Sequence, residues 1–207
     1  VLGGYKNVVN GQQYGVTIGG AHNNGSGGTS TAIGGSHNTA AEDRSLAAVG
    51  FSNTANADYS VTLGGAYNTT SGYGAMAIGG GGAYLDGDTI YYDPGNNTAS
   101  GESAAVVNGY GNTASGYFST VSGGFSNTAT GNYSTIFGGN THTASGENAA
   151  ASGGYNNTAE GDTSSVFGGN TNTASGKWST ASGGHLNTAT GEYSGTVVGY
   201  KNTASGK

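Results

Sequence analysis

Residues 123–138 read Gly-Gly-Phe-Ser-Asn-Thr-Ala-Thr-Gly-Asn-Tyr-Ser-Thr-Ile-Phe-Gly, and the same phrase begins again at Gly138. When each unit is counted from its second glycine, most units are 15 residues long, and fourteen units cover the 207 residues. Internal repetition at a short fixed period is typical of a solenoid, in which each repeat forms one coil and stacks on the next. The repeat therefore decides the fold.

The composition favours an ordered repeat over a disordered chain. The sequence has 44 glycines, 33% hydrophobic residues and only 8% charged residues, which is unlike an ordinary globular domain. Disordered segments are commonly enriched in charge and proline, whereas this chain has one proline and 10% aromatic residues. We therefore expect an ordered fold without a conventional core.

The length of the repeat selects the kind of solenoid. Helical repeats need about 33 residues and propeller blades about 40, but 15 residues accommodate two short strands and two tight turns. Glycine also disfavours helix by about 1 kcal/mol per position relative to alanine. The sequence predicts an all-β parallel β-solenoid or β-roll of about 14 coils with 15 residues per coil. We expect one repeat domain over residues 1–207 that is a fragment of a longer fibre.

Positions within a unit are numbered here from the second glycine as zero. Position +7 is glycine in 12 of the 14 units, and together with the Gly-Gly pair it predicts two corners per coil at which glycine adopts a positive φ. Position +3 is asparagine in 12 of the 14 units. Coils about 4.8 Å apart would let these amides form a structural hydrogen-bond ladder. The ladder residues are Asn97, Asn112, Asn127, Asn157, Asn172 and Asn187.

Two further positions define a thin interior. Position +5 is usually alanine, and position +12 carries small or medium apolar residues such as Val121, Ile136 and Ala151. Because side chains alternate along a strand, we expect +3 and +5 to face inward and the threonines at +4 to face outward. Such a coil buries little apolar area per residue, so association of several chains would help its stability.

Position +13 alternates in size in the C-terminal half. Its residues are Ser122, Phe137, Ser152, Phe167, Ser182 and Val197. Two interpretations explain the alternation equally well. It is either volume matching between neighbouring coils or the trace of a duplicated 30-residue block.

Several second strands resemble the YadA-like head repeat of trimeric autotransporter adhesins. These segments are Ser30–Gly34 (Ser-Thr-Ala-Ile-Gly), Ser45–Gly50, Ser60–Gly64 and Ala75–Gly79, with Thr-Ala-Ser-Gly in phase. The family's usual period is one residue shorter, and the family often has alanine where this chain has asparagine at +3. The resemblance implies a left-handed β-roll, a side-by-side homotrimer, and display outside a cell for attachment; related repeats are expected in viral and phage fibres.

The unit at 80–94 breaks the pattern. Between Gly80 and Pro94 the chain reads Gly-Gly-Ala-Tyr-Leu-Asp-Gly-Asp-Thr-Ile-Tyr-Tyr-Asp, which lacks the Asn-Thr-Ala strand. Three interpretations are open: an irregular loop that offsets the register, carbohydrate contact by the tyrosines, or calcium binding, although the spaced ligands of a calcium loop are missing. This unit and the rings at +9 are the candidate ligand contacts. They comprise Tyr84, Asp86, Asp88, Tyr91, Tyr92, Asp93, Tyr133, Trp178 and Tyr193.

Other chemistry is scarce, so we expect no enzyme, no cofactor and no metal. The chain has no cysteine, which removes thiol nucleophiles and zinc clusters, and no Gly-x-Ser-x-Gly elbow in a catalytic setting. His22 and His37 share position +2 in consecutive coils but have no third ligand. A net charge of −6 with five Lys and Arg residues disfavours nucleic acid. No signal peptide or membrane-spanning segment is evident.

The sequence thus predicts a non-enzymatic structural or adhesive fibre segment on a cell or virion surface. Its expected partners are copies of itself and a host glycan, matrix protein or other surface. Two alternatives are a self-assembling extracellular filament and an ice-binding solenoid. The threonine column at +4 suggests the latter, with Thr98, Thr113, Thr128, Thr143 and Thr158.

Overall fold

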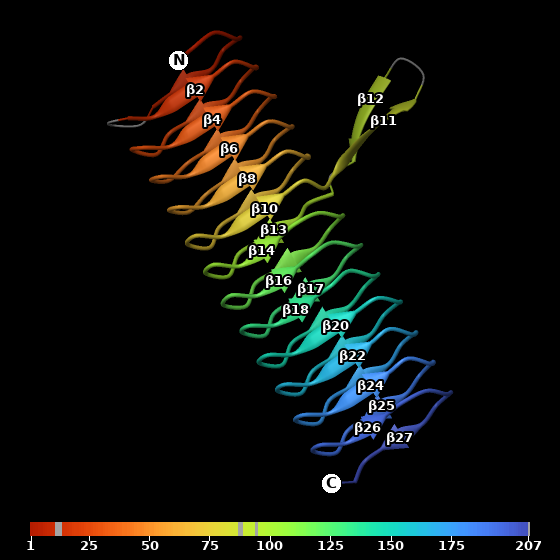
Figure 1. Ribbon diagram of the computed structural model, residues 1–207. Coiled ribbons are helices and arrows are strands. Elements are labelled where there is room, and N and C mark those ends of the chain that lie inside the picture. Colours follow the sequence, from red (N-terminus) through yellow and green to blue (C-terminus); the bar gives the residue numbers. More distant parts are fainter. Residues whose placement is uncertain (11–13, 87–88, 94, 207) are drawn as a thin grey trace. The chain divides into compact units, whose positions relative to one another are not determined.

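The chain folds as a parallel β-solenoid of about 12 turns with about 15 residues per turn (Figure 1). The computed structural model describes residues 1–10, 14–86, 89–93 and 95–206, and for 82–86 and 89–93 it describes only the backbone. The secondary structure of these residues consists of strands, turns and bends without a helix. The predicted fold class is therefore confirmed.

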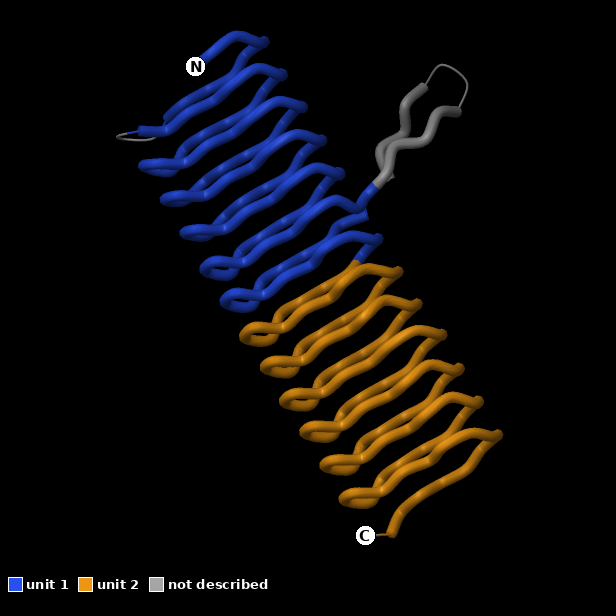
Figure 2. The backbone as a smooth tube through the Cα atoms, in the orientation of Figure 1, with its two compact units in different colours: residues 1–111 blue, residues 112–207 orange. Residues whose placement is uncertain are grey.

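Two compact units make up the chain, residues 1–111 (unit 1) and residues 112–207 (unit 2) (Figure 2). Each turn gives one strand to each of two parallel sheets. In unit 1 the first sheet contains β1 (Val8–Val9), β3 (Asn24–Gly25), β5 (Thr39–Ala40), β7 (Thr54–Ala55), β9 (Thr69–Thr70) and β13 (Thr98–Ala99). The second sheet contains β2 (Val16–Ile18), β4 (Thr31–Ile33), β6 (Leu46–Ala48), β8 (Val61–Leu63), β10 (Met76–Ile78) and β14 (Ala105–Val106).

Unit 2 repeats this arrangement. Its first sheet contains β15 (Thr113–Ala114), β17 (Thr128–Ala129), β19 (Thr143–Ala144), β21 (Thr158–Ala159), β23 (Thr173–Ala174), β25 (Thr188–Ala189) and β27 (Thr203–Ala204). Its second sheet contains β16 (Thr120–Val121), β18 (Thr135–Ile136), β20 (Ala150–Ser152), β22 (Ser165–Phe167), β24 (Thr180–Ser182) and β26 (Gly195–Thr196). Equivalent residues of successive repeats pair directly, as Thr128 does with Thr143.

One interruption explains why there are fewer turns than the 14 coils expected. Strand pairing passes from Thr69 to Thr98 and from Met76 to Ala105, so the unit at 80–94 is not a coil. Its strands β11 (Gly82–Asp86) and β12 (Thr89–Asp93) instead pair with each other in an antiparallel hairpin. The unit therefore offsets the register as expected, but as a paired hairpin instead of an irregular loop.

The interior is formed by positions +3, +5, +10 and +12. In the turn of β17 and β18 these residues are Asn127, Ala129, Ser134 and Ile136, all of which are fully buried. The equivalent asparagines, alanines and serines of most other turns are buried as well. Threonines at +4, such as Thr128, lie on the outer side and are half-buried. The expected alternation of inward and outward residues is present, and the interior is one layer of small side chains.

The asparagine side chains bond to backbone groups of their own and the next turn. Asn172 donates from Nδ2 to the carbonyls of Gly168 and Gly184, both at 3.1 Å, and its Oδ1 accepts the N–H of Asn187 at 2.9 Å. Asn127 likewise donates from Nδ2 to the carbonyls of Gly123 and Gly139 and accepts the N–H of His142 on Oδ1. The ladder is thus made of side-chain to backbone bonds, each of which also satisfies a buried peptide group.

The two kinds of corner glycine serve different purposes. Gly168 and Gly169 have φ values of +76° and +82°, the left-handed region that glycine adopts most easily. In contrast, none of the described +7 glycines of unit 2 has a positive φ. A Cβ at Gly131 would lie 2.0 Å from the carbonyl oxygen of Gly146. The expectation of a positive φ at +7 is therefore wrong, since close stacking of the turns explains these glycines.

Candidate functional site

Because the interior holds small and amide side chains, partner recognition falls to residues outside it. Among the described residues there is no group of three or more His, Cys, Asp or Glu side chains arranged to hold a metal. The described residues also contain no helix long and apolar enough to cross a membrane. The candidate surfaces are therefore the hairpin, the corners and the outer faces of the two sheets.

The hairpin brings most of the predicted contact positions together. Its register places Tyr84 opposite Tyr91 and Asp86 opposite Thr89. Directly opposed residues in an antiparallel pair occupy the same face, and alternate residues follow them. One face of the hairpin thus contains Tyr84, Asp86, Tyr91 and Asp93, and the other face contains Tyr92. The remaining candidate, Asp88, lies outside the described residues.

The other three predicted contacts lie at the +9 corner. Tyr133, Trp178 and Tyr193 have φ values of +58°, +54° and +57°. A left-handed conformation costs a residue with a side chain about 1–2 kcal/mol, and glycine would avoid this cost. Ser103, Asn148 and Thr163 share this position and conformation with the large rings, so the backbone of the +9 corner is set by the coil and not by the ring.

Trp178 takes part in an aromatic stack at this corner. Its ring lies parallel to that of Tyr193, with an interplanar angle of 9° and a centroid distance of 4.7 Å. Lys177 Nζ lies 4.2 Å from the Trp178 centroid, and the tight stack leaves only the opposite face for it. Trp178 is 39% exposed in this arrangement. Tyr193, which is 65% exposed, keeps the more open ring surface.

A second aromatic cluster forms around Tyr133. Phe118 stacks on Tyr133 at 5.9 Å, and Tyr117 meets both rings edge to face at 4.5 and 5.6 Å. Analysis of the sequence did not select Tyr117 or Phe118 as contacts. Their repeat positions, +8 and +9, could have identified them as candidate contacts, because these positions are variable and lie beside the +7 corner.

The opposite corner of unit 1 has a continuous file of rings. It runs from Tyr5 through His22, His37 and Phe51 to Tyr67, with neighbouring centroids 4.8–5.5 Å apart. His22 and His37 are stacked at 4.8 Å, the distance expected for consecutive coils. Both are exposed, and Ser36 Oγ lies 2.7 Å from His37 Nδ1. These contacts stabilise the edge without assembling a catalytic or metal site.

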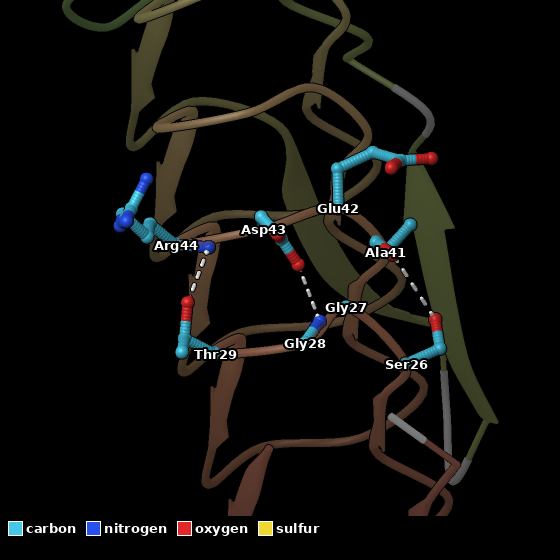
Figure 3. Close-up of a pocket in the computed structure, with 8 residues that line it drawn as sticks. All are labelled: Ser26, Gly27, Gly28, Thr29, Ala41, Glu42, Asp43 and Arg44. Carbon is cyan, nitrogen blue, oxygen red and sulfur yellow. Dashed lines mark hydrogen bonds between the residues drawn. The ribbon is translucent and has the colours of Figure 1, made fainter. Parts of the chain in front are cut away.

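A shallow polar recess of about 440 Å³ lies at the +7 to +9 corner of unit 1, between residues 26–29 and 41–44 (Figure 3). Its polar groups bond to each other: the Gly28 N–H donates to Asp43 Oδ1 at 2.6 Å, and the Arg44 N–H donates to Thr29 Oγ1 at 3.1 Å. The side chains of Glu42 and Arg44 extend to opposite sides of the recess (Figure 3). No set of reactive side chains converges there.

The outer face of the second sheet in unit 1 is strongly apolar. We call the following outward side chains of β2, β4, β6, β8 and β10 the apolar face: Val16, Ile18, Ile33, Leu46, Val61, Leu63, Met76 and Ile78. All are half-buried or exposed. Val16, Ile18 and Met76 are its exposed members, and apolar residues gathered on an outer face make it a candidate interaction surface.

The outer side of the first sheet has a different character. In unit 2 its threonines pair in register at every step from Thr113 to Thr203, through β15, β17, β19, β21, β23, β25 and β27. Parallel strands about 4.8 Å apart therefore form a regular row of hydroxyl groups. Exposed Ser or Thr residues at +6 accompany most of them, and Glu160 interrupts this second row.

Comparison with known proteins does not identify a function for any of these surfaces. No model of a protein family and no curated protein sequence matches this chain.

Proposed function

We propose that this chain is a non-enzymatic segment of a surface fibre that associates with copies of itself and attaches to a partner outside the cell. The observation that carries the proposal is the apolar face of unit 1. It occupies successive strands of a parallel sheet, so it repeats with each turn. A surface of this kind suits side-by-side packing of identical solenoids, as in the homotrimer that the resemblance to YadA-like heads implies.

Energetics support association. The buried apolar residues of the interior are mostly alanines with a few valines and one isoleucine, and hydrophobic stabilisation scales with buried apolar area. Packing Ile33, Leu63 and Ile78 against another chain would remove further apolar surface from water. The assembly is expected to be more resistant to denaturant than one chain by itself.

Attachment is assigned to residues that the solenoid does not need. The hairpin between Gly82 and Asp93 and the open ring of Tyr193 offer tyrosines and carboxylates, a combination suited to glycans and to polar protein surfaces. The expected location is the exterior of a cell or virion, and the expected ligand is a host glycan or a matrix protein.

The test begins with sedimentation of the full chain. A discrete assembly, with a trimer as the expected mass, supports the proposal, whereas a monomer at micromolar concentration contradicts it. End-to-end fibres under the electron microscope would instead favour the structural filament. A glycan array and immobilised matrix proteins then test attachment.

The chain offers a matched control for attachment. Removing residues 82–95 joins Gly81 to Asn96 and gives Gly80-Gly81-Asn96-Asn97-Thr98, the spacing found at Gly154–Thr158. This variant should keep the solenoid and the assembly but lose binding if the hairpin carries it. Unchanged binding would transfer the assignment to the corner rings, which Tyr193→Ser then tests.

The threonine row favours a second candidate, ice binding. A regular file of hydroxyl groups on a parallel sheet is able to order water at a fixed spacing, and the row in unit 2 is in register. Thermal hysteresis and faceted ice crystals would support this function. Their absence at millimolar protein concentration would eliminate it.

A further inference from the structure

One turn of unit 2 departs from the interior pattern. His142 occupies position +3, where the other turns of unit 2 have asparagine, and it is fully buried. Its backbone N–H donates to Asn127 Oδ1 at 2.8 Å, as in the other turns. The imidazole therefore replaces one amide of the ladder.

The imidazole reproduces only part of what an asparagine does. Its Nδ1 accepts the N–H of Asn157 at 3.0 Å, the role that Oδ1 has elsewhere. Its Nε2 is buried and makes no hydrogen bond of normal geometry, although the Gly153 backbone lies near enough to favour the charged ring. Nδ2 of Asn157, in contrast, reaches two glycine carbonyls. Because Nδ1 accepts a hydrogen bond, the neutral ring must have its proton on Nε2.

The corner beside His142 is also altered. The φ values of the Gly-Gly pair vary between turns, with +146° and +91° at Gly123 and Gly124, +99° and +105° at Gly138 and Gly139, and +59° and +84° at Gly153 and Gly154. The difference at His142 lies in the contacts. A Cβ at Gly139 would lie 2.0 Å from His142 Nε2 and 3.1 Å from the next turn's carbonyl oxygen, whereas at Gly154 the corresponding carbonyl distance is 2.1 Å. The imidazole of His142 therefore lies where, in the next turn, the glycine corner and the following carbonyl approach each other closely.

We propose that His142 makes the solenoid sensitive to acid at this one turn, because a proton on Nδ1 removes the acceptor of the Asn157 N–H and opens the contact between neighbouring turns. The proton comes from solvent and forms a covalent N–H bond at Nδ1 of His142. No other covalent bond changes. Two N–H donors then face each other beside a buried charge. Opening the corner to water relieves both penalties.

The direction of the pH dependence follows from burial, which lowers the pKa of His142 below its ordinary value of 6.5. The open turn therefore binds a proton more readily than the closed one, so stability of the contact is full above pH 6.5 and falls as the pH drops toward the lowered pKa. The turn of β17 has no charged side chain. Glu147, Glu160 and Asp162 on the other two turns are exposed.

Hydrogen exchange of the full chain tests the proposal. After correction for the intrinsic pH dependence of exchange, protection in residues 138–158 should fall by up to about tenfold per pH unit below pH 6.5. His142→Asn restores the repeat and should abolish this loss, while the exposed control His185→Asn should retain it. Glu147, Glu160 and Asp162 are present in all three proteins and cancel in the comparison.

Two outcomes would overturn the proposal. One is protection that stays constant down to pH 5 in the unaltered chain. The other is an equal loss in His142→Asn. Nitrogen chemical shifts provide an independent check, since they should place the proton of His142 on Nε2 at pH 7.5, and a proton on Nδ1 contradicts the mechanism.

Discussion

The second sheet buries the same repeat positions in both units but has very different outer faces. In unit 1 the outward positions +11 and +13 hold the apolar face, for example Val61 with Leu63 and Met76 with Ile78. In unit 2 they hold hydroxyl residues and alternating rings, for example Thr135 with Phe137 and Ser165 with Phe167. The inward position +12 between them is buried in either unit.

This comparison separates the residues that build the solenoid from those that specify its interactions. Inward side chains face the opposite sheet of the same turn, so their size is limited by the thin interior. Outward side chains meet no such limit. The two units therefore share one fold while presenting different surfaces, and the variants below test this separation.

The largest effect is expected from truncating the shared asparagine ladder. Asn53→Ala in unit 1 leaves the carbonyls of Val49 and Gly65 and one N–H without their partner. Asn172→Ala in unit 2 does the same to the carbonyls of Gly168 and Gly184 and one N–H. At about 1–3 kcal/mol per buried unpaired group, and with the carbonyls only part-buried, each should lower the free energy of unfolding by about 3–5 kcal/mol, the lower half of the summed range. Urea titration followed by circular dichroism measures this.

The outward neighbour provides the control for both truncations. Thr173→Ala, on the outside of β23, should cost less than about 1 kcal/mol. Similar losses in Asn53→Ala and Asn172→Ala support a common interior. A large difference between them would show that the two units are not built alike.

A smaller loss is expected at the +7 corner. In Gly146→Ala the new Cβ would lie 2.1 Å from the carbonyl oxygen of Gly161, so the turns must separate locally at a cost of about 1–3 kcal/mol. Unit 1 already has Ala57 at this position, where its N–H bonds to Ser60 Oγ instead of to the next turn. Ala57→Gly should change stability by less than Gly146→Ala, and an equal change would refute the steric explanation.

Removing strain should give a modest gain in unit 1. Val49 replaces the first glycine of the pair and has a φ of +51°, an unfavourable conformation for a β-branched residue. Val49→Gly should raise the free energy of unfolding by about 1 kcal/mol. Val198 has the same repeat position in unit 2 without a positive φ, so Val198→Gly should give no gain in the same urea titration.

The smallest effect on folding is expected from lysine on the outer face. Val61→Lys with Met76→Lys keeps aliphatic stems on the apolar face and should change the free energy of unfolding by less than about 1 kcal/mol, yet dissociate the assembly in sedimentation. The matched pair Thr120→Lys and Thr135→Lys has the same repeat positions in unit 2. Equal dissociation by both pairs would contradict the special role of unit 1.

Much of the fold was predictable because stacking constrains the residues that every turn must share. Asn127, Ala129 and Ile136 recur at fixed positions since each occupies the same interior place, and their inward orientation followed from alternation. The reason for Gly131 was not predictable. Whether glycine relieves a backbone angle or makes room for a neighbouring turn depends on atoms 15 residues away.

The candidate surfaces were less predictable. The Tyr and Asp residues around Tyr84 were noticed because they depart from the repeat, but the hairpin required long-range pairing to be known. The contacts of Trp178 with Lys177 and Tyr193 depend on the positive φ values of Trp178 and Tyr193. The residue types at these positions do not predict a positive φ. His142 is a single substitution in the asparagine column at +3. Its proposed role in acid sensitivity follows only from its burial, which the sequence does not show.

The sequence by itself determined the period, the strand class and the interior positions +3, +5 and +12, because a 15-residue repeat of glycine, asparagine and alanine has few other ways to satisfy its backbone. The burial of the serines at +10, such as Ser134, was not predicted. The tertiary structure decided which outer residues meet. The stacking of successive turns places the ring of Phe118 against that of Tyr133. It also aligns the apolar face across five strands. Contacts between turns, rather than neighbours in sequence, create these surfaces.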